Sequence, residues 1–218
     1  MPKKASPMPV ADLAPPSKGE QTRAKLLEAA HGLFLRQGFH GTRMRQIADK
    51  AGLAVGGIYN HFQDKEEIFA AVLDAYHPYH TLLPALEASQ GETIDDFVRD
   101  VFRRVQTEIA GAETRLLPLV FMDLVEFQGR HLRQLAQRIA PQALAFFQRF
   151  AEQRGPLRAT IPPVVMLRTL ISLFLGYLLT ALALRDAPIL RSEQGEIDWF
   201  GHMAEIYLHG IVADQAEA

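Results

Sequence analysis

The sequence has no cysteine and a single tryptophan among its 218 residues. The lack of cysteine excludes disulfide bonds, thiolate zinc sites and a cysteine nucleophile. A net excess of charge is also missing, since 23 Lys and Arg residues face 25 Asp and Glu residues. Hydrophobic residues make up 48% of the chain, which is typical of a globular protein with a sizeable core.

Two targeting signals are absent or incomplete. The N-terminal Lys3 and Lys4 are not followed by an apolar segment, so we expect no secretory signal. Residues 164–184 are mostly apolar, but the uninterrupted run after Arg168 is shorter than the roughly 20 residues that span a bilayer. We interpret this stretch as a buried helix, apolar all round, in a cytoplasmic protein that does not enter the membrane.

The charge is unevenly distributed along the chain. Residues 1–60 contain nine Lys and Arg against four Asp and Glu, whereas residues 61–218 contain fourteen against twenty-one. A basic N-terminal part favours contact with a polyanion, although chance gives an asymmetry of this size as well. Residues 1–19, rich in proline and small side chains, are expected to form a disordered arm.

Apolar residues recur at helical spacing almost throughout, and no segment alternates convincingly as a strand does. The sequence predicts an all-α fold without internal repeats. We expect a first helix from Glu20 to Gln37, ended by Gly38. A second short helix follows, capped by Thr42 and stopped by Gly52, and a third segment covers residues 54–61.

Cap patterns predict the next helices. Asp64, with Glu67 three residues on, is typical of the start of a helix over residues 64–77 that Pro78 ends. Thr93 and Asp96 predict the same for a helix over residues 94–109. Further helices are expected near 114–128, 130–153 with a break or kink at Pro141, 162–185 and 196–213.

Residues 42–65, TRMRQIADKAGLAVGGIYNHFQDK, have the pattern of a helix-turn-helix. Ala48 is small enough for close packing, Gly52 can take the positive φ of the turn, and Ile58 and Phe62 supply apolar contacts. The outer side of the second short helix would enter the major groove of DNA. Amides near Thr42 and nearby basic residues would contact phosphates. The predicted DNA-binding residues are Thr42, Arg43, Arg45, Val55, Gly56, Gly57, Tyr59, Asn60, His61 and Lys65.

The segment from Thr22 to Tyr76 resembles the DNA-binding domain of the tetracycline-repressor (TetR) family of bacterial regulators. The matching residues are Leu33, Phe34, Gly38, Phe39, Thr42, Ile47, Ala48, Ala51, Gly52, Gly56, Tyr59, His61, Phe62, Lys65 and Glu66. The resemblance implies that Tyr59 and Lys65 bind phosphates. The sequence departs from the family at Ala54, where a capping Ser or Thr is frequent, and at Val55 and Gly57, which are commonly polar.

The same resemblance implies a helical domain from about residue 80 that senses a ligand and forms a dimer. We therefore predict a DNA-binding domain over residues 20–65 and an effector-binding and dimerisation domain over 66–218, joined by the helix near 64–77. The predicted dimer interface comprises Leu170, Phe174, Gly176, Tyr177, Trp199, Met203, Ile206 and Tyr207. A large monomer core is the alternative for these residues. The predicted effector pocket comprises Phe121, Met122, Asp123, Glu126, Phe127, Phe146, Phe147 and Phe150.

Several of these side chains have a plainer interpretation. The aromatic residues of the predicted pocket are equally typical of a helical core. Asp123 and Glu126 either meet a cationic or hydrogen-bonding group of the effector or form salt bridges with Arg115, Arg130 or Arg133. His61 either binds phosphate or only packs. His77 and His80 have metal-ligand spacing, but no third ligand is evident, so we predict neither a metal nor a cofactor.

The sequence thus predicts a ligand-responsive transcription regulator, a repressor, that binds a near-palindromic operator as a homodimer. The effector is expected to be small and largely apolar. No arrangement of residues supports an enzyme. A protein-binding adaptor whose helix-turn-helix has lost DNA contact is the main alternative, and the departures at Val55 and Gly57 motivate it.

Overall fold

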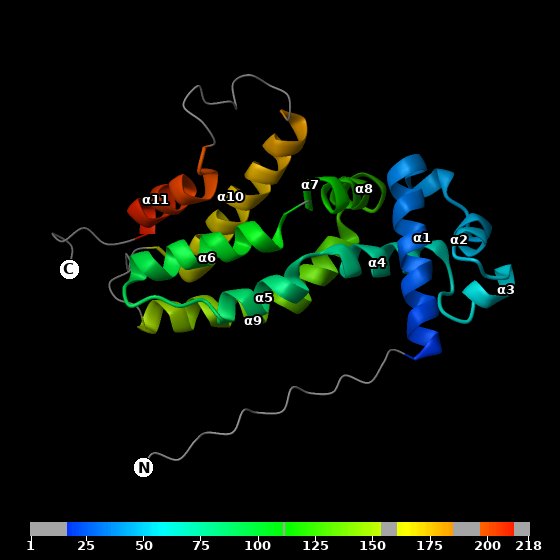
Figure 1. Ribbon diagram of the computed structural model, residues 1–218, viewed down its shortest axis with the longest axis horizontal. Coiled ribbons are helices and arrows are strands. Elements are labelled where there is room, and N and C mark those ends of the chain that lie inside the picture. The colour runs from blue at the N-terminus through cyan, green and yellow to red at the C-terminus, as the bar shows by residue number, and fades with distance from the viewer. Residues whose placement is uncertain (1–16, 111, 154–160, 185–196, 212–218) are drawn as a thin grey trace, which may run out of the picture. The chain divides into compact units, whose positions relative to one another are not determined.

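The computed structural model describes residues 17–110, 112–153, 161–184 and 197–211. These residues form helices and no strands, which confirms the predicted all-α fold (Figure 1). The helices are α1 (Lys18–Gly41), α2 (Met44–Lys50), α3 (Val55–Ile58), α4 (Lys65–Tyr76), α5 (Tyr79–Glu87), α6 (Ile94–Glu108), α7 (Ala112–Arg115), α8 (Leu117–Glu126), α9 (Arg130–Gln153), α10 (Pro163–Ala183) and α11 (Trp199–Ile211).

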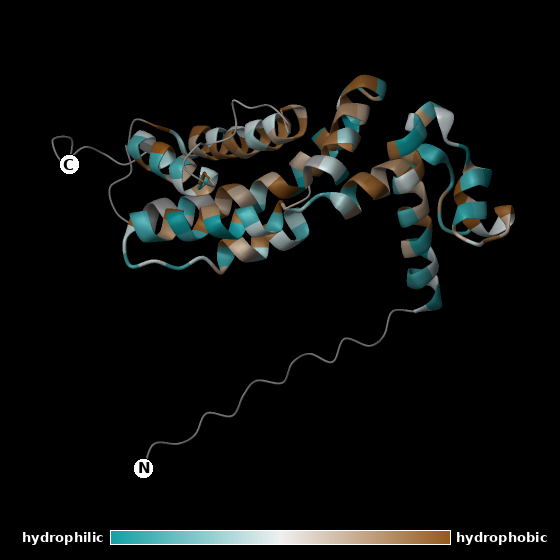
Figure 2. Cartoon of the chain, turned by 45° about the horizontal axis from the view of Figure 1, so that its top comes forward, coloured by the Kyte–Doolittle hydropathy of each residue, from teal (hydrophilic) through white to brown (hydrophobic). Residues whose placement is uncertain are grey.

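The chain divides into two compact units, with the boundary between Val72 and Leu73. The boundary therefore falls inside α4, later than the predicted limit at residue 65. Hydrophobic and hydrophilic residues alternate along the helices of both units, as expected for helices that bury one side (Figure 2).

Helix α1 begins earlier than predicted because of a capping box. The Ser17 hydroxyl accepts a hydrogen bond from the Glu20 amide at 3.2 Å, and the Glu20 carboxylate accepts one from the Ser17 amide at 2.7 Å. Hydrogen bonding of the Glu20 carboxylate to the side chain and the amide of Ser17 lowers the pKa of Glu20. Lys18 and Gly19 are thus helical although they lie in the predicted arm, whose residues 1–16 lie outside the described residues.

In the second unit, α6 packs against α5 and α11, and α9 packs against α5, α8 and α10. The Phe102 ring lies 5.0 Å from that of Phe174 and 5.9 Å from that of Tyr207, and the Phe174 ring lies 5.9 Å from that of Phe200. This aromatic cluster joins α6, α10 and α11 into one core.

The helix ends agree with the predicted caps at two places. The Asp64 carboxylate accepts a hydrogen bond from the Glu67 amide at 2.8 Å, and the Thr93 hydroxyl accepts one from the Asp96 amide at 3.1 Å. Three details differ from the prediction. Helix α5 was not expected, the helix predicted over 114–128 is divided into α7 and α8, and α9 runs through Pro141 without a break.

Helix α10 is long and apolar enough to cross a membrane by length and composition alone, with a mean hydropathy of 1.9 over an 18-residue window. Its buried residues, Met166, Leu170, Phe174 and Leu178, follow one another every four residues and form one stripe. The opposite stripe is exposed within the single chain, so the prediction of a helix buried all round is correct for one side only.

Candidate nucleic-acid interface

The first unit is held together by a small core to which each of its helices contributes. Leu26, Ile47 and Ile58, from α1, α2 and α3, are completely buried, as is Phe69 from α4. The rings of Phe34 and Phe69 meet edge to face with their centroids 5.5 Å apart. The side of each short helix that faces the core is therefore known, and the remaining residues of each helix face outward.

The turn between α2 and α3 is a Schellman motif. Gly52 has a φ of 74°, its amide donates to the Asp49 carbonyl at 3.1 Å, and the Leu53 amide donates to the Ala48 carbonyl at 2.9 Å. Only glycine adopts this conformation without steric cost. The predicted role of Gly52 in the turn agrees with this geometry.

Helix α3 has only four residues, and turns continue it as far as Phe62. The amides of His61 and Phe62 both donate to the Ile58 carbonyl at 3.0 Å. No side chain caps its N-terminus, as expected with alanine at position 54. Ile58 and Phe62 face the core, and the predicted groove-facing residues lie on the other side.

Most of the predicted DNA-binding side chains are exposed. Tyr59 is 54% exposed and Val55 36%. Arg43, Arg45, Gly56 and Asn60 are also exposed, while Gly57 and His61 are half-buried. The Arg45 guanidinium lies 3.8 Å from the Asp49 carboxylate, a contact between two highly exposed side chains that leaves Arg45 able to reach an anion.

Thr42 and Lys65 both form hydrogen bonds within the protein, and Thr42 does not cap α2 as predicted. Thr42 is 1% exposed, and its hydroxyl donates to the Gly38 carbonyl at 2.8 Å. It does not cap α2, which begins after Arg43, and the Arg43 amide donates a hydrogen bond to Gln46 Oε1 at 2.8 Å. The Thr42 side chain is therefore a structural group of the loop after α1.

Lys65 binds that same loop. Its Nζ donates to the Phe39 carbonyl at 2.6 Å and to the Thr42 carbonyl at 2.8 Å, and it lies 4.2 Å from the centre of the Phe39 ring. Burial lowers the pKa of this ammonium group. Two of its three N–H groups are thus used inside the protein, and no local pattern indicates this because the partners lie 26 and 23 residues away.

With this geometry established, comparison with known proteins identifies the unit. Residues 26–72 match the family model described as bacterial regulatory proteins, tetR family. The N-terminal domain belongs to the tetR family. The HTH-type transcriptional regulator TtgR of Pseudomonas putida is 37% identical over 75 residues. That alignment covers 34% of this chain and 36% of TtgR, so it spans about a third of the relative.

Solved structures extend the likeness beyond the tetR-family domain. NalD, the secondary repressor of the MexAB-OprM multidrug efflux pump in Pseudomonas aeruginosa, covers 90% of this chain and all of its own, with a TM-score of 0.65 at 23% identity. SmeT of Stenotrophomonas maltophilia, in complex with triclosan, covers 89% of this chain and 93% of its own, with a TM-score of 0.62 at 27% identity. The chain therefore has the fold of these repressors, a helix-turn-helix domain followed by a larger helical region.

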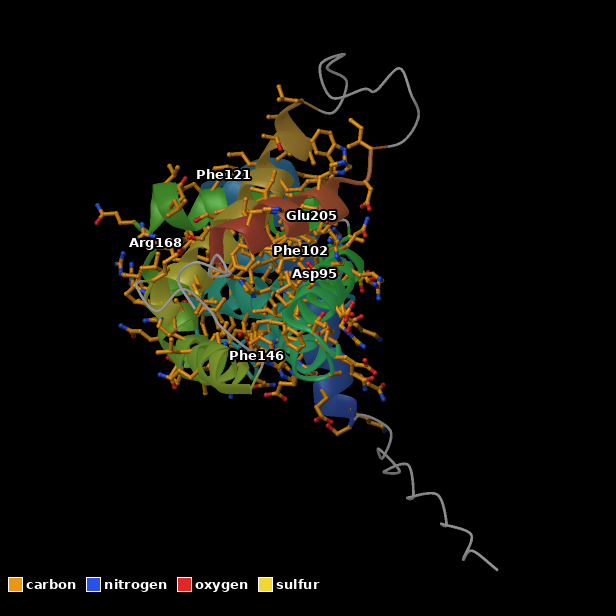
Figure 3. The ribbon with its side chains drawn as sticks, turned by 90° about the vertical axis from the view of Figure 1, so that its left-hand side faces the viewer. Asp95, Phe102, Phe121, Phe146, Arg168 and Glu205 are labelled. Atoms are coloured by element: carbon orange, nitrogen blue, oxygen red, sulfur yellow. The ribbon has the colours of Figure 1, made fainter. Side chains whose placement is uncertain are left out.

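The residues predicted for an effector pocket are not brought together as one set. Phe121 is 43% exposed on α8 (Figure 3), whereas Phe146 is buried and stacks on Phe97 with centroids 6.1 Å apart. Met122 is half-buried, Glu126 is exposed and Phe127 is buried. The side chains of Phe147 and Phe150 lie outside the described residues.

Asp123 is completely buried, and its carboxylate is satisfied by the start of α9. One oxygen lies 2.7 Å from His131 Nδ1, and the other accepts a hydrogen bond from the Leu132 amide at 3.0 Å. The partner is thus a histidine rather than one of the arginines weighed above. Asp123 is a structural group of the α8–α9 turn, where Gln128 and Gly129 both have positive φ.

A pocket of about 330 Å³ lies elsewhere in the second unit, between α6 and α11. At its edge Arg99 is bonded to Asp95 of α6 and to Glu205 of α11 (Figure 3). The lining residues are Arg99, Phe102, Arg103, Gln106, Asp198, Phe200, Gly201 and Ala204. None of the predicted pocket residues is among them, and the predicted effector site stays a prediction.

The predicted dimer residues fall into two groups. Leu170, Phe174 and Tyr207 are buried in their own unit, and the Tyr207 hydroxyl donates to the Met166 carbonyl at 3.0 Å. These three residues thus belong to the core of the single chain, as in the alternative given above, and the dimer interface stays a prediction. Gly176, Trp199 and Ile206 are exposed, and Tyr177 and Met203 are half-buried.

The end of α4 is held by a polar cluster within the second unit. The Asp74 carboxylate is bonded to Arg138 of α9 and accepts a hydrogen bond from the Tyr79 hydroxyl of α5 at 3.0 Å. His77, one residue beyond α4, accepts a hydrogen bond from the Tyr79 amide at 3.2 Å. Burial is the main cause that lowers the pKa of His77 to about 4. His77 and His80 belong to this cluster, and within the described residues no group suited to hold a metal ion occurs.

Proposed function

We propose that this protein is a ligand-responsive transcription repressor that binds a near-palindromic operator as a homodimer. The observation that carries the proposal is the tetR-family domain, whose short α3 presents an exposed outer side next to exposed arginines. An α-helix in this setting has the size that the major groove admits. Arg43 and Arg45 supply positive charge for the phosphates beside it.

The exposed side of α10 supports the homodimer. Val164, Ile171, Leu175, Leu179 and Leu182 are each at least 38% exposed and recur at helical spacing on one stripe. Only Arg168, which points outward, interrupts this stripe (Figure 3). Together with Trp199 and Ile206 of α11 the stripe offers an apolar surface that a second copy would cover, and two helices from each copy would form a four-helix interface.

A small, largely apolar effector would bind the second unit and change operator affinity. SmeT, a relative in fold, is described in complex with triclosan and as the repressor of a multidrug efflux pump. In this chain α4 runs across the boundary of the two units, and its last turn is bonded to α5 and α9 through Asp74. An effector that binds the protein more tightly in one arrangement of this cluster would favour that arrangement and so change the conformation of α4.

The DNA-binding part is tested by selecting bound duplexes from a random pool and measuring their affinity at several salt concentrations. Log affinity should fall with log salt by about 0.9 for each phosphate contact. Arg45→Gln should flatten this slope, while Lys25→Gln, an exposed change on α1, serves as the control. Failure to retain any duplex, or a flat salt response, would support an adaptor instead.

The homodimer is tested separately by sedimentation. Leu175→Glu, in the centre of the exposed stripe, should give a monomer because it leaves a carboxylate in an apolar interface. Thr169→Glu adds the same charge to an exposed position outside the stripe and should leave the dimer intact. A dimer that survives Leu175→Glu would place the interface on another surface.

A further inference from the structure

The first turn of α3 has no side chain that can form a hydrogen bond with a base. Ala54, Val55 and Gly56 are exposed and Gly57 is half-buried, and none of the four has a side-chain donor or acceptor. In helix-turn-helix proteins it is the N-terminal residues of the recognition helix that contact base edges. This turn therefore offers the base edges only methyl groups and backbone.

The two glycines are not required by the protein's own structure. Unlike Gly52, neither Gly56 nor Gly57 has a positive φ. A Cβ atom at either position would meet no atom within 4 Å. Glycine is also a poorer helix residue than alanine. Neither conformation nor internal packing explains the pair, whereas a molecule that approaches α3 closely from outside does.

Val55 is the one larger side chain on this turn. It is 36% exposed, whereas Ile58, three residues on, is completely buried. The two branched side chains of this short helix thus lie on opposite sides of it, Val55 toward solvent and Ile58 toward the core. In the major groove a branched apolar side chain matches one chemical feature of the base pairs, the C5 methyl group of thymine.

We propose that the first turn of α3 recognises a thymine in each operator half-site by contact between the Val55 side chain and the thymine methyl group. Gly56 and Gly57 leave the space that allows α3 to lie deep enough for this contact. The inference rests on the proposed function, because it names the base feature that the DNA-binding surface reads.

Uracil provides a direct test, because it differs from thymine only in lacking the methyl group. Each thymine of a selected operator is replaced in turn, in both half-sites, and affinity is measured by fluorescence anisotropy. At one position the replacement should weaken binding about fourfold per half-site, or about sixteenfold for the symmetric pair, since one buried methyl group contributes about 0.8 kcal/mol. Val55→Ala, which removes two of the three side-chain carbons, should reduce this discrimination between thymine and uracil, and a double-mutant cycle measures the reduction.

The outcomes separate this inference from the proposed function. If no duplex is selected, the proposed function fails. If a duplex binds with a steep salt dependence but tolerates uracil at every position, the methyl contact alone is refuted. The same holds if Val55→Ala keeps the full discrimination.

The glycine pair is tested by Gly56→Ala and Gly57→Ala. Each should raise the midpoint of thermal unfolding and weaken operator binding by more than the roughly fourfold effect of one methyl contact. Gly210→Ala in α11 is the matched control, because a Cβ there also meets no atom within 4 Å. It should leave operator affinity unchanged. Alanine variants at positions 56 and 57 that bind the operator as well as the parent would overturn the role of the glycines.

Discussion

Lys65 should stabilise the DNA-binding domain rather than contact DNA, and Lys65→Met tests this directly. The variant keeps an apolar side chain of similar length and removes the ammonium group that bonds the Phe39 and Thr42 carbonyls. Hydrogen bonds to a charged group contribute about 1.5–3 kcal/mol each. Because Lys65 is only partly buried, we take the low end for both and expect a loss of about 3 kcal/mol.

The effect is local, so the assay must report on the first unit. The single tryptophan, Trp199, lies in the second unit and reports on that part of the chain. Hydrogen exchange of peptides from residues 39–64, read by mass spectrometry, gives the opening free energy of the loop, α2 and α3. Lys25→Met, at an exposed position of α1, is the control and should leave exchange unchanged.

A second readout distinguishes the two roles of Lys65. If it neutralised a phosphate, its removal would flatten the dependence of log affinity on log salt by about 0.9 per subunit. We expect the salt dependence to stay nearly constant and exchange to accelerate. Unchanged exchange with a flatter salt dependence would refute the structural role and restore the phosphate contact.

Three further predictions concern stability. The folded state holds His77 neutral, with a pKa of about 4, so the unfolded chain takes up the proton first. The contribution of neutral His77 to the free energy of unfolding should therefore be fully present above about pH 6.5. It should be lost, by up to about 3 kcal/mol, as the pH drops toward 4. Urea unfolding at several pH values should show this fall, and His77→Asn should reduce it. Gly52→Ala should lower the free energy of unfolding by about 1–2 kcal/mol, because alanine is strained at the positive φ of this position. A neutral result in denaturant unfolding would contradict this strain. Asp123→Ala should cost about 3 kcal/mol because it leaves His131 and the Leu132 amide without their acceptor; unchanged stability in calorimetry would show that water replaces the carboxylate.

The parts of the fold that the sequence predicted well depend on local chemistry. Asp64 and Thr93 cap their helices through amides three residues away, so the signal and its partner lie in one short stretch. Ser17 and Glu20 form the same pattern, and that pattern would have placed the start of α1 correctly. Helix α5 was not predicted because Pro78 was interpreted only as the end of the preceding helix, although Pro78 directly precedes the first residue of α5.

The parts that could not be predicted depend on contacts between distant residues. Lys65 carries charge beside the helix-turn-helix, and nothing in its neighbours indicates that the Phe39 and Thr42 carbonyls bind it. Likewise, Leu170 and Leu175 of α10 look alike in sequence, but only the first faces the chain's own core. Which apolar side is buried is decided by the arrangement of α7, α9 and α11, against which α10 packs, and the sequence pattern alone does not contain it.

Helix α4 has a consequence for how changes in length would act on this protein. Its first residue is attached to the loop after α1, and its last turn is attached to α5 and α9. Twelve residues of α-helix form a rod of about 18 Å in which each added residue rotates one end by about 100°. A single residue inserted at its middle would put the two attachments out of helical phase with each other and turn Val72 away from the buried side that it shares with Phe69, so we expect the first unit to lose stability and the proposed response to an effector to be lost.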